Sequence, residues 1–176
     1  MRRILFLYAL LLWGAVVNAQ IQRNFFGLEI GSATKQQVEE TLKGMGKQYS
    51  SKTNEVNTHD IELEGYDWAN VKFGFKGDKL VLLLLTSRTY ELKEKFTAES
   101  DASTIKSLVQ DKYKDYQYLY VNNGKIVAFY DEVTMSAFFE TPKTLQFGLA
   151  YADGNTFKNL LNQLNIKLKS RKCRLQ

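Results

Sequence analysis

The sequence predicts an α+β domain in which an antiparallel sheet carries its helices on one face. Apolar residues recur at helical spacing in three segments, which begin near residues 34, 100 and 155. Between these segments the apolar period changes to two, and turns follow one another closely, which is typical of antiparallel strands. The order is helix, four strands, helix, four strands, helix. It allows a tandem duplication with halves at 24–88 and 100–166, although the halves share pattern rather than residue identity.

The first predicted helix begins with a capping box at Thr34 and Gln37, in which each side chain satisfies a backbone amide of the first turn. Val38, Leu42 and Met45 follow at spacings of four and three, and they predict one buried stripe. A Gly-x-Gly pair then ends the helix, because glycine adopts the left-handed cap without strain. The apolar lead before the helix, at residues 20–31, is expected to pack against the domain.

The strands of the first half are predicted from alternation. A weak strand is expected at 47–51, and the polar residues 50–59 are expected to form a loop. Alternating segments at 60–64 and 71–76 predict strands with one apolar face. A Gly-Asp turn leads into the continuous apolar run at 80–87, which predicts a central strand covered on both faces.

The second half repeats this order after a polar connection at residues 88–99. Ser100 or Asp101 is expected to cap a helix, and the strands after it are joined by turns, of which Asn122-Asn123-Gly124 is the clearest hairpin signal. The helix is expected to bury Ile105, Leu108, Val109 and either Lys112 or Tyr113. The strands are predicted at 116–121, 126–130, 133–139 and 145–151, and a closing helix from Asn155 carries Phe157, Leu160, Leu161 and Leu164.

Residues 1–19 have the three parts of a secretory signal. Arg2 and Arg3 precede an uncharged run at 4–17, and Val17-Asn18-Ala19 places small or compact residues before a cut at Gln20. The alternative is a retained membrane anchor, which needs about 20 apolar residues and is therefore disfavoured. No cysteine lies near the cut, so a lipid anchor is not expected. The sequence predicts a periplasmic or secreted domain at 20–166 without a stable membrane anchor.

The charge excludes a nucleic-acid role. Removal of the signal lowers the net charge from +5 to +3, and five Lys or Arg residues of the remainder lie in the basic tail at 167–176. The body is left slightly acidic, which is atypical of a nucleic-acid-binding domain. Cys173 is the single cysteine, so the chain cannot form an internal disulfide.

Few residues offer catalytic or metal chemistry. His59 is the one histidine, and an ordinary zinc site needs three or four His or Cys ligands. No nucleotide-binding or metalloprotease motif occurs, so neither a cofactor nor a metal is predicted. Asp60, Glu62 and Glu64 lie at a spacing of two on one predicted strand. They suggest a hydrolase only if they flank a cleft; a solvated strand face is the interpretation that alternation favours.

The aromatic residues are the clearest candidates for binding. Tyr116, Tyr118 and Tyr120 lie on one face of a single predicted strand. One interpretation is a cross-strand aromatic ladder packed by its neighbours. The other is an exposed binding platform, extended by Tyr130 and by Tyr151 on neighbouring strands, since tyrosine is enriched at interfaces. Trp68, at a predicted turn, either caps the core or is presented to a ligand.

A short part of the chain resembles small exported domains of Gram-negative bacteria. The residues concerned are Ile30-Gly31-Ser32 at the helix entry, Val38 and Leu42 on the helix, and the hairpin with Phe73 and Phe75. They resemble the β-lactamase-inhibitory-protein-like fold and the outer-membrane lipoprotein SmpA/OmlA-like domain. The lipoprotein's anchoring cysteine and the inhibitory proteins' disulfides are absent here. The resemblance implies a role in protein binding or in the cell envelope, and no single residue's role is transferred.

These observations together favour an exported, non-catalytic domain that binds a protein or another macromolecule of the bacterial envelope through its sheet face. Two alternatives stay open. One is a small periplasmic hydrolase that uses Asp60, Glu62 and Glu64, with His59 assisting. The other is a structural subunit of an envelope assembly. The sequence predicts no oligomeric state.

Overall fold

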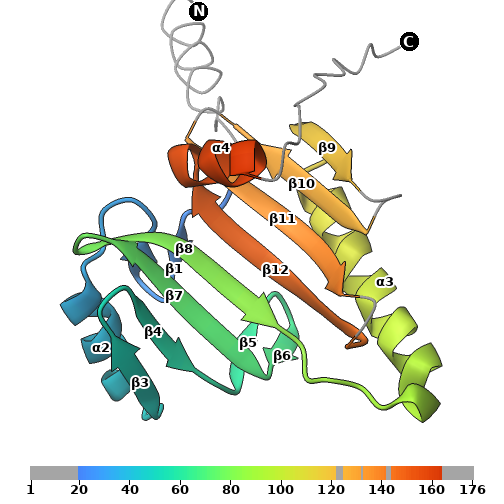
Figure 1. Cartoon of the computed structure of the whole chain (residues 1–176), viewed down its shortest axis with the longest axis horizontal. Helices are drawn as coiled ribbons and strands as arrows, with labels where there is room; N and C mark the ends of the chain where they lie inside the picture. Colours follow the sequence, from blue (N-terminus) through green and yellow to red (C-terminus); the bar gives the residue numbers. More distant parts are fainter. Residues whose placement is uncertain (1–19, 122–124, 132, 142–143, 164–176) are drawn as a thin grey trace, which may run out of the picture.

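Eight strands form one antiparallel sheet in the computed structural model, which describes residues 20–121, 125–131, 133–141 and 144–163 (Figure 1). The elements of the first half are β1 (Asn24–Phe25), β2 (Leu28–Glu29), α2 (Lys35–Gly44), β3 (Tyr49–Lys52), β4 (Glu55–Thr58), β5 (Ile61–Leu63), β6 (Tyr66–Trp68), β7 (Asn70–Lys76) and β8 (Lys79–Thr86). Those of the second half are the 3₁₀ turn η1 (Leu92–Glu94), α3 (Lys95–Lys112), β9 (Gln117–Val121), β10 (Ile126–Tyr130), β11 (Thr134–Thr141), β12 (Gln146–Asp153) and α4 (Gly154–Gln163). The predicted α+β class with an antiparallel sheet is confirmed.

The strand order is symmetric about the middle of the sheet. It runs β3-β4-β7-β8-β12-β11-β10-β9, so each half contributes four strands in chain order from its outer edge to the centre. The halves meet where β8 and β12 pair antiparallel, from Leu82 opposite Ala152 to Thr86 opposite Gly148. A helix precedes each set of four strands. This is the order that two consecutive helix–four-strand units produce.

The main core lies on the face that α2 and α3 cover. Val38 and Leu42 of α2 belong to the same buried cluster as Ile105 and Val109 of α3. The other face carries a smaller cluster, to which β9, β10, β11 and β12 contribute. Its buried members are Leu119, Ala128, Met135, Ala137 and Ala152. Figure 1 shows α3 passing behind β10 and β11, whereas α4 lies in front of the ends of β11 and β12.

The first helix forms where the capping box predicts it. Thr34 accepts from the amide of Gln37, and the Gln37 side chain accepts from the amide of Thr34. Val38 and Leu42 are fully buried, as expected. Met45 is 40% exposed, so its predicted burial is wrong. The reason is that α2 ends at Gly44, and Met45 sits at its cap rather than on the stripe.

The predicted loop at 50–59 is wrong, because these residues form the β3–β4 hairpin. Val56 and Thr58 of β4 are buried and Tyr49 of β3 packs against the main core, while the remaining residues of the hairpin are polar. The predicted strand at 60–64 is β5, which pairs with β6 in a separate hairpin rather than joining the main sheet. The apolar lead packs as expected, with Ile21 and Phe25 in the main core.

The second helix begins earlier than predicted. It starts at Lys95 rather than at Ser100 or Asp101, because Glu91 and Glu94 cap the preceding 3₁₀ turn reciprocally. Its first turns bury only alanines, Ala98 and Ala102, which give a weak apolar signal. Leu108 is 50% exposed, so its predicted burial is wrong, whereas Tyr113 is buried as one alternative required.

The remaining strands lie close to their predicted limits, and α4 follows β12 directly. The Asp153 carboxylate begins α4 by accepting from the amides of Asn155 and Thr156. The predicted signal at 1–19, the 122–124 turn, Leu164 and the basic tail lie outside the described residues. Among the described residues, no helix combines the length and apolar character that a bilayer span requires.

Candidate functional site

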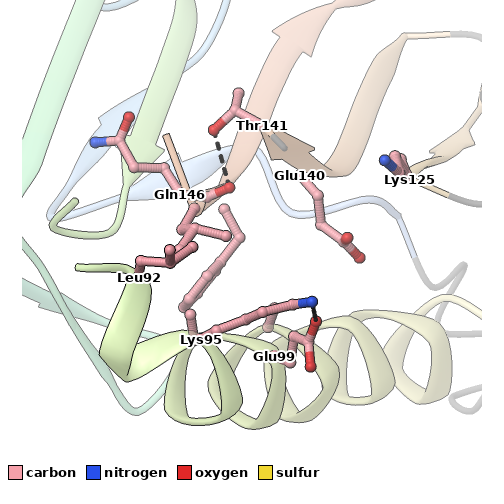
Figure 2. Close-up of a pocket in the computed structure, with 11 residues that line it drawn as sticks. Leu92, Lys95, Glu99, Lys125, Glu140, Thr141 and Gln146 are labelled. Carbon is pink, nitrogen blue, oxygen red and sulfur yellow. Dashed lines mark hydrogen bonds and ion pairs between the residues drawn. The ribbon is translucent and has the colours of Figure 1, made fainter. Parts of the chain in front are cut away.

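One well-formed hollow in the described part of the chain is a groove beside the N-terminal half of α3. It lies between that helix and the end of the β11–β12 hairpin, and its volume is about 440 Å³ (Figure 2). We call it the α3 groove. It is lined by Leu92, Lys95, Ala98, Glu99, Ala102, Lys125, Glu140, Thr141, Leu145, Gln146 and Phe147.

The floor of the α3 groove is apolar and rigidly backed. Phe147 is 1% exposed and lies at the base, with Ala98 and Ala102 of α3 across from it. Behind Phe147, ring centroids lie within 6.4 Å for four other aromatic residues, an arrangement that favours edge-to-face and stacked contacts. These four are Tyr66, Trp68, Tyr90 and Phe138.

The rim of the groove carries both signs of charge. Lys95 and Glu99 lie one turn apart on α3, with 3.7 Å between the ammonium nitrogen and a carboxylate oxygen. Across the groove, Glu140 of β11 approaches Lys106 of α3 at 3.9 Å. Figure 2 shows the Lys95–Glu99 pair at the helix side and Glu140 and Lys125 at the sheet side. The Lys95–Glu99 pair is more than half exposed and contributes little to stability, so both of its charges can meet a ligand.

Two large apolar side chains stand in solvent at the start of α3, and one of them, Leu92, lines the α3 groove. Leu92 is 82% exposed and Phe96 is 85% exposed. Leu92 belongs to the 3₁₀ turn η1 and Phe96 to the first turn of α3. No other large apolar side chain in the described residues is more than 51% exposed. Exposed apolar side chains close in sequence to a groove with an apolar floor are typical of an interaction site.

The segment that presents Leu92 is held firmly. The Arg88 guanidinium donates to both oxygens of Glu94, at 3.0 and 2.8 Å, and this lowers the pKa of the Glu94 carboxyl to about 2. Arg88 also lies 4.1 Å from the centre of the Tyr90 ring. The Tyr90 hydroxyl donates to Asp101 at 2.7 Å and accepts from Tyr66. Burial and these contacts raise the pKa of Tyr90 well above its usual value.

The predicted tyrosine platform is only partly exposed. Tyr116 and Tyr118 are half-buried and pack against the main core. Tyr120 is 51% exposed, and its hydroxyl accepts from Gln110 of α3 at 2.9 Å. Tyr118 contacts Tyr120 on the same strand edge-to-face, with centroids 5.2 Å apart, and contacts Phe129 across the strands at 6.4 Å, the kind of contact that the ladder interpretation expects. Tyr130 faces the opposite side of the sheet and packs on the smaller cluster, so it does not extend this face.

Trp68 is not presented to a ligand. It is fully buried, and its indole N–H donates to the Leu63 carbonyl at 2.9 Å. The predicted position at a turn is also wrong, since Trp68 is the last residue of β6. Tyr151 is likewise fully buried. Trp68 acts on the α3 groove only from behind, through the packing of Phe147.

The candidate acids do not gather in a cleft. The Asp60 carboxylate is 2.6 Å from His59, and both side chains are more than half exposed. Glu64 occupies the two-residue β5–β6 turn with a positive φ of 56° and pairs with Lys112 at 2.5 Å. Glu62 is exposed on β5. Within the described ranges, no three His, Cys, Asp or Glu residues are placed to hold a metal ion.

The groove was missed because its entrance falls in the segment predicted as a polar connection. The one available signal was the spacing of Leu92 and Phe96 within a run of otherwise charged residues. Comparison with known proteins adds no relative: no family model, no curated protein and no solved structure matches the chain.

Proposed function

We propose that this protein is an exported, non-catalytic domain that binds another protein in the α3 groove. The observation that carries the proposal is the 82% exposure of Leu92, which lines a groove with an apolar floor, together with the 85% exposure of Phe96 at the start of α3. Leaving two large apolar side chains in water is unfavourable by about 25 cal/mol for each Å² of apolar surface. A partner that covers them recovers this free energy, which is why buried apolar anchors dominate interfaces.

The chemistry of the groove defines the partner. Its floor accepts an apolar side chain or a short apolar segment, and its rim offers Lys95 and Lys125 together with Glu99 and Glu140. A polypeptide with apolar residues flanked by charges of both signs fits this lining. The tyrosines of β9 do not line this groove.

The test is site-specific photo-crosslinking in the cell. A photoreactive phenylalanine analogue at position 96 is expected to give a discrete cross-linked product. The matched control places it at Leu108, which is also exposed on α3 but lies beside a different hollow. Once the cross-linked protein is purified, the L92S/F96S variant is expected to bind it at least tenfold more weakly, while L108S binds as the wild type does. Equal cross-linking at 96 and 108 would rule out the α3 groove.

Export is tested separately. The protein recovered from the exported fraction is expected to begin at Gln20, directly before the buried Ile21. A chain that keeps Met1 and stays in the membrane fraction would contradict cleavage and release without affecting the proposal for the α3 groove.

A permanent structural contact and a reversible one would use the same surface, and the dissociation rate of the purified complex distinguishes them.

A further inference from the structure

The two edges of the sheet differ in how well they are protected. An edge strand exposes unpaired backbone amides and carbonyls, and natural proteins block such edges with charges, prolines, bulges or covering side chains. β3 forms one edge and β9 forms the other. Within the described residues, β9 pairs with β10 alone.

The β3 edge is blocked by charge and by side chains from α2. Lys52 at its end pairs with Glu55 at 2.9 Å, and its carbonyl accepts from the Lys35 ammonium. Ser51 donates to Glu39 of α2 at 2.7 Å. A second strand could approach this edge only by displacing these contacts.

The β9 edge has none of this protection in its sequence. Its five residues, Gln-Tyr-Leu-Tyr-Val, include no charge, no proline and no glycine. They combine high β-propensity with a 51% exposed tyrosine at position 120. Such an edge is a template for a further strand.

We propose that the β9 edge is a dimer interface, at which β9 pairs antiparallel with β9 of a second copy of this chain. A two-fold axis at Leu119 places Tyr118 opposite Tyr120 of the partner and Gln117 opposite Val121, so the pairing is self-complementary. A strand with charged residues of one sign repels a second copy of itself, whereas β9 contains no charged residue. The paired tyrosines would continue the aromatic row that Tyr118 already forms with Phe129 and Tyr120.

The same kind of contact already exists inside the chain. β8 and β12, the last strands of the two halves, join their four-stranded units by antiparallel edge pairing. The β9–β9 contact would repeat this at the outer edge and build one continuous sixteen-stranded sheet. It leaves the α3 groove of each copy open, because the groove lies at the other end of α3 from Gln110, which contacts Tyr120.

Sedimentation velocity of the purified protein over a hundredfold concentration range tests the proposal. The wild type is expected to convert from monomer to dimer as its concentration rises. Tyr120→Lys adds a charge to the edge and is expected to weaken dimerisation at least tenfold, with its far-UV circular dichroism unchanged because position 120 is half in solvent. The matched control is Ser50→Lys on the β3 edge, which is expected to dimerise as the wild type does.

The position of the interface is tested with a nitroxide label. A label at Tyr120→Cys, in a Cys173→Ser background, is expected to show dipolar broadening in the dimer, since diagonal neighbours across paired strands lie only about 7–8 Å apart. A label at Ser50→Cys is expected to show none. A protein that stays monomeric throughout, or a dimer that Tyr120→Lys does not weaken, would overturn the proposal. The proposal would also be overturned if the protein stayed monomeric and the label at position 120 lost mobility only when a different protein was added.

Discussion

Single residues show how closely the sheet is packed. Gly148 of β12 lies opposite Phe139, whose ring covers the space that a side chain would need. A Cβ atom at position 148 would lie 2.4 Å from the Leu85 carbonyl oxygen and 2.4 Å from the Phe139 ring. Because Leu85 belongs to the neighbouring central strand, its backbone cannot move aside without disturbing the β8–β12 pairing.

Gly148→Ala is therefore expected to destabilise the domain by roughly 1–3 kcal/mol, the usual range for overpacking. Gly44→Ala is the matched control, since a Cβ there meets nothing within 4 Å at the end of α2. That change is expected to be neutral or stabilising by up to about 1 kcal/mol. Urea unfolding of both variants measures the difference. Equal midpoints would show that the two central strands can separate to admit a methyl group.

A second residue-scale prediction separates the two tyrosines of β9. Tyr118 is half-buried against Phe129 and the core, so Tyr118→Ala is expected to cost about 2 kcal/mol of unfolding free energy. Tyr120 is half in solvent, so Tyr120→Ala is expected to cost less than about 1 kcal/mol. Thermal melts at low protein concentration measure both. A larger loss of unfolding free energy for Tyr120→Ala than for Tyr118→Ala would mean that Tyr120 contributes more to packing than Tyr118 does.

At the scale of elements, the connection from β8 to α3 is held by charge. The Arg88 guanidinium lowers the pKa of Glu94 to about 2, below the usual value of 4.5. A carboxyl whose pKa is lower in the folded state binds fewer protons there than in the unfolded state. Its stabilising contribution is therefore complete above about pH 4.5 and is lost as the pH falls toward 2.

Glu94→Gln removes this contribution, so the variant is expected to be less stable than the wild type at pH 7 and to approach it in stability as the pH falls from 4.5 to 2. Denaturant unfolding at several pH values measures the difference, and 1 M salt is expected to shrink it because both side chains reach solvent. A difference that stays constant over this range would place the effect in packing rather than in the ion pair.

The elements that the sequence predicts well are those with a strong local signal. The capping box at Thr34 and the alternation of Val71, Phe73 and Phe75 both lead to the observed α2 and β7. The weak strand predicted at 47–51 overlaps β3, whereas β4 was missed because only two of its residues, Val56 and Thr58, are buried among polar neighbours. The start of α3 was missed because small alanines rather than large apolar residues face the sheet there.

The candidate site was harder to predict, because exposure depends on tertiary packing. Trp68 and Tyr118 are residue types common at interfaces, yet Trp68 is fully buried and Tyr118 is half-buried against the main core. Leu92 and Phe96 are residue types common in cores, yet they stand in solvent. Residue type gives a preference for binding, but only the arrangement of the elements decides which side chain water reaches.

At the scale of the whole molecule, the two halves depend on each other. Leu83 and Leu85 of β8 are fully buried, and Leu149 and Tyr151 of β12 lie in the same core. The core is thus one cluster that crosses the symmetric centre of the sheet rather than two separate ones. A half taken alone would expose this apolar surface together with an unprotected strand edge.

Neither half is therefore expected to fold alone. Residues 20–88 and 89–176, expressed separately, are expected to be largely unfolded or aggregated, whereas the two fragments expressed together are expected to form a one-to-one complex through β8 and β12. Size-exclusion chromatography and far-UV circular dichroism measure both results. If the halves descend from one duplicated unit, β8 of the first fragment and β12 of the second are the edges through which two copies of that unit would have paired. A cooperative unfolding transition from a monomeric 20–88 fragment would show instead that the first helix and its strands form an independent domain.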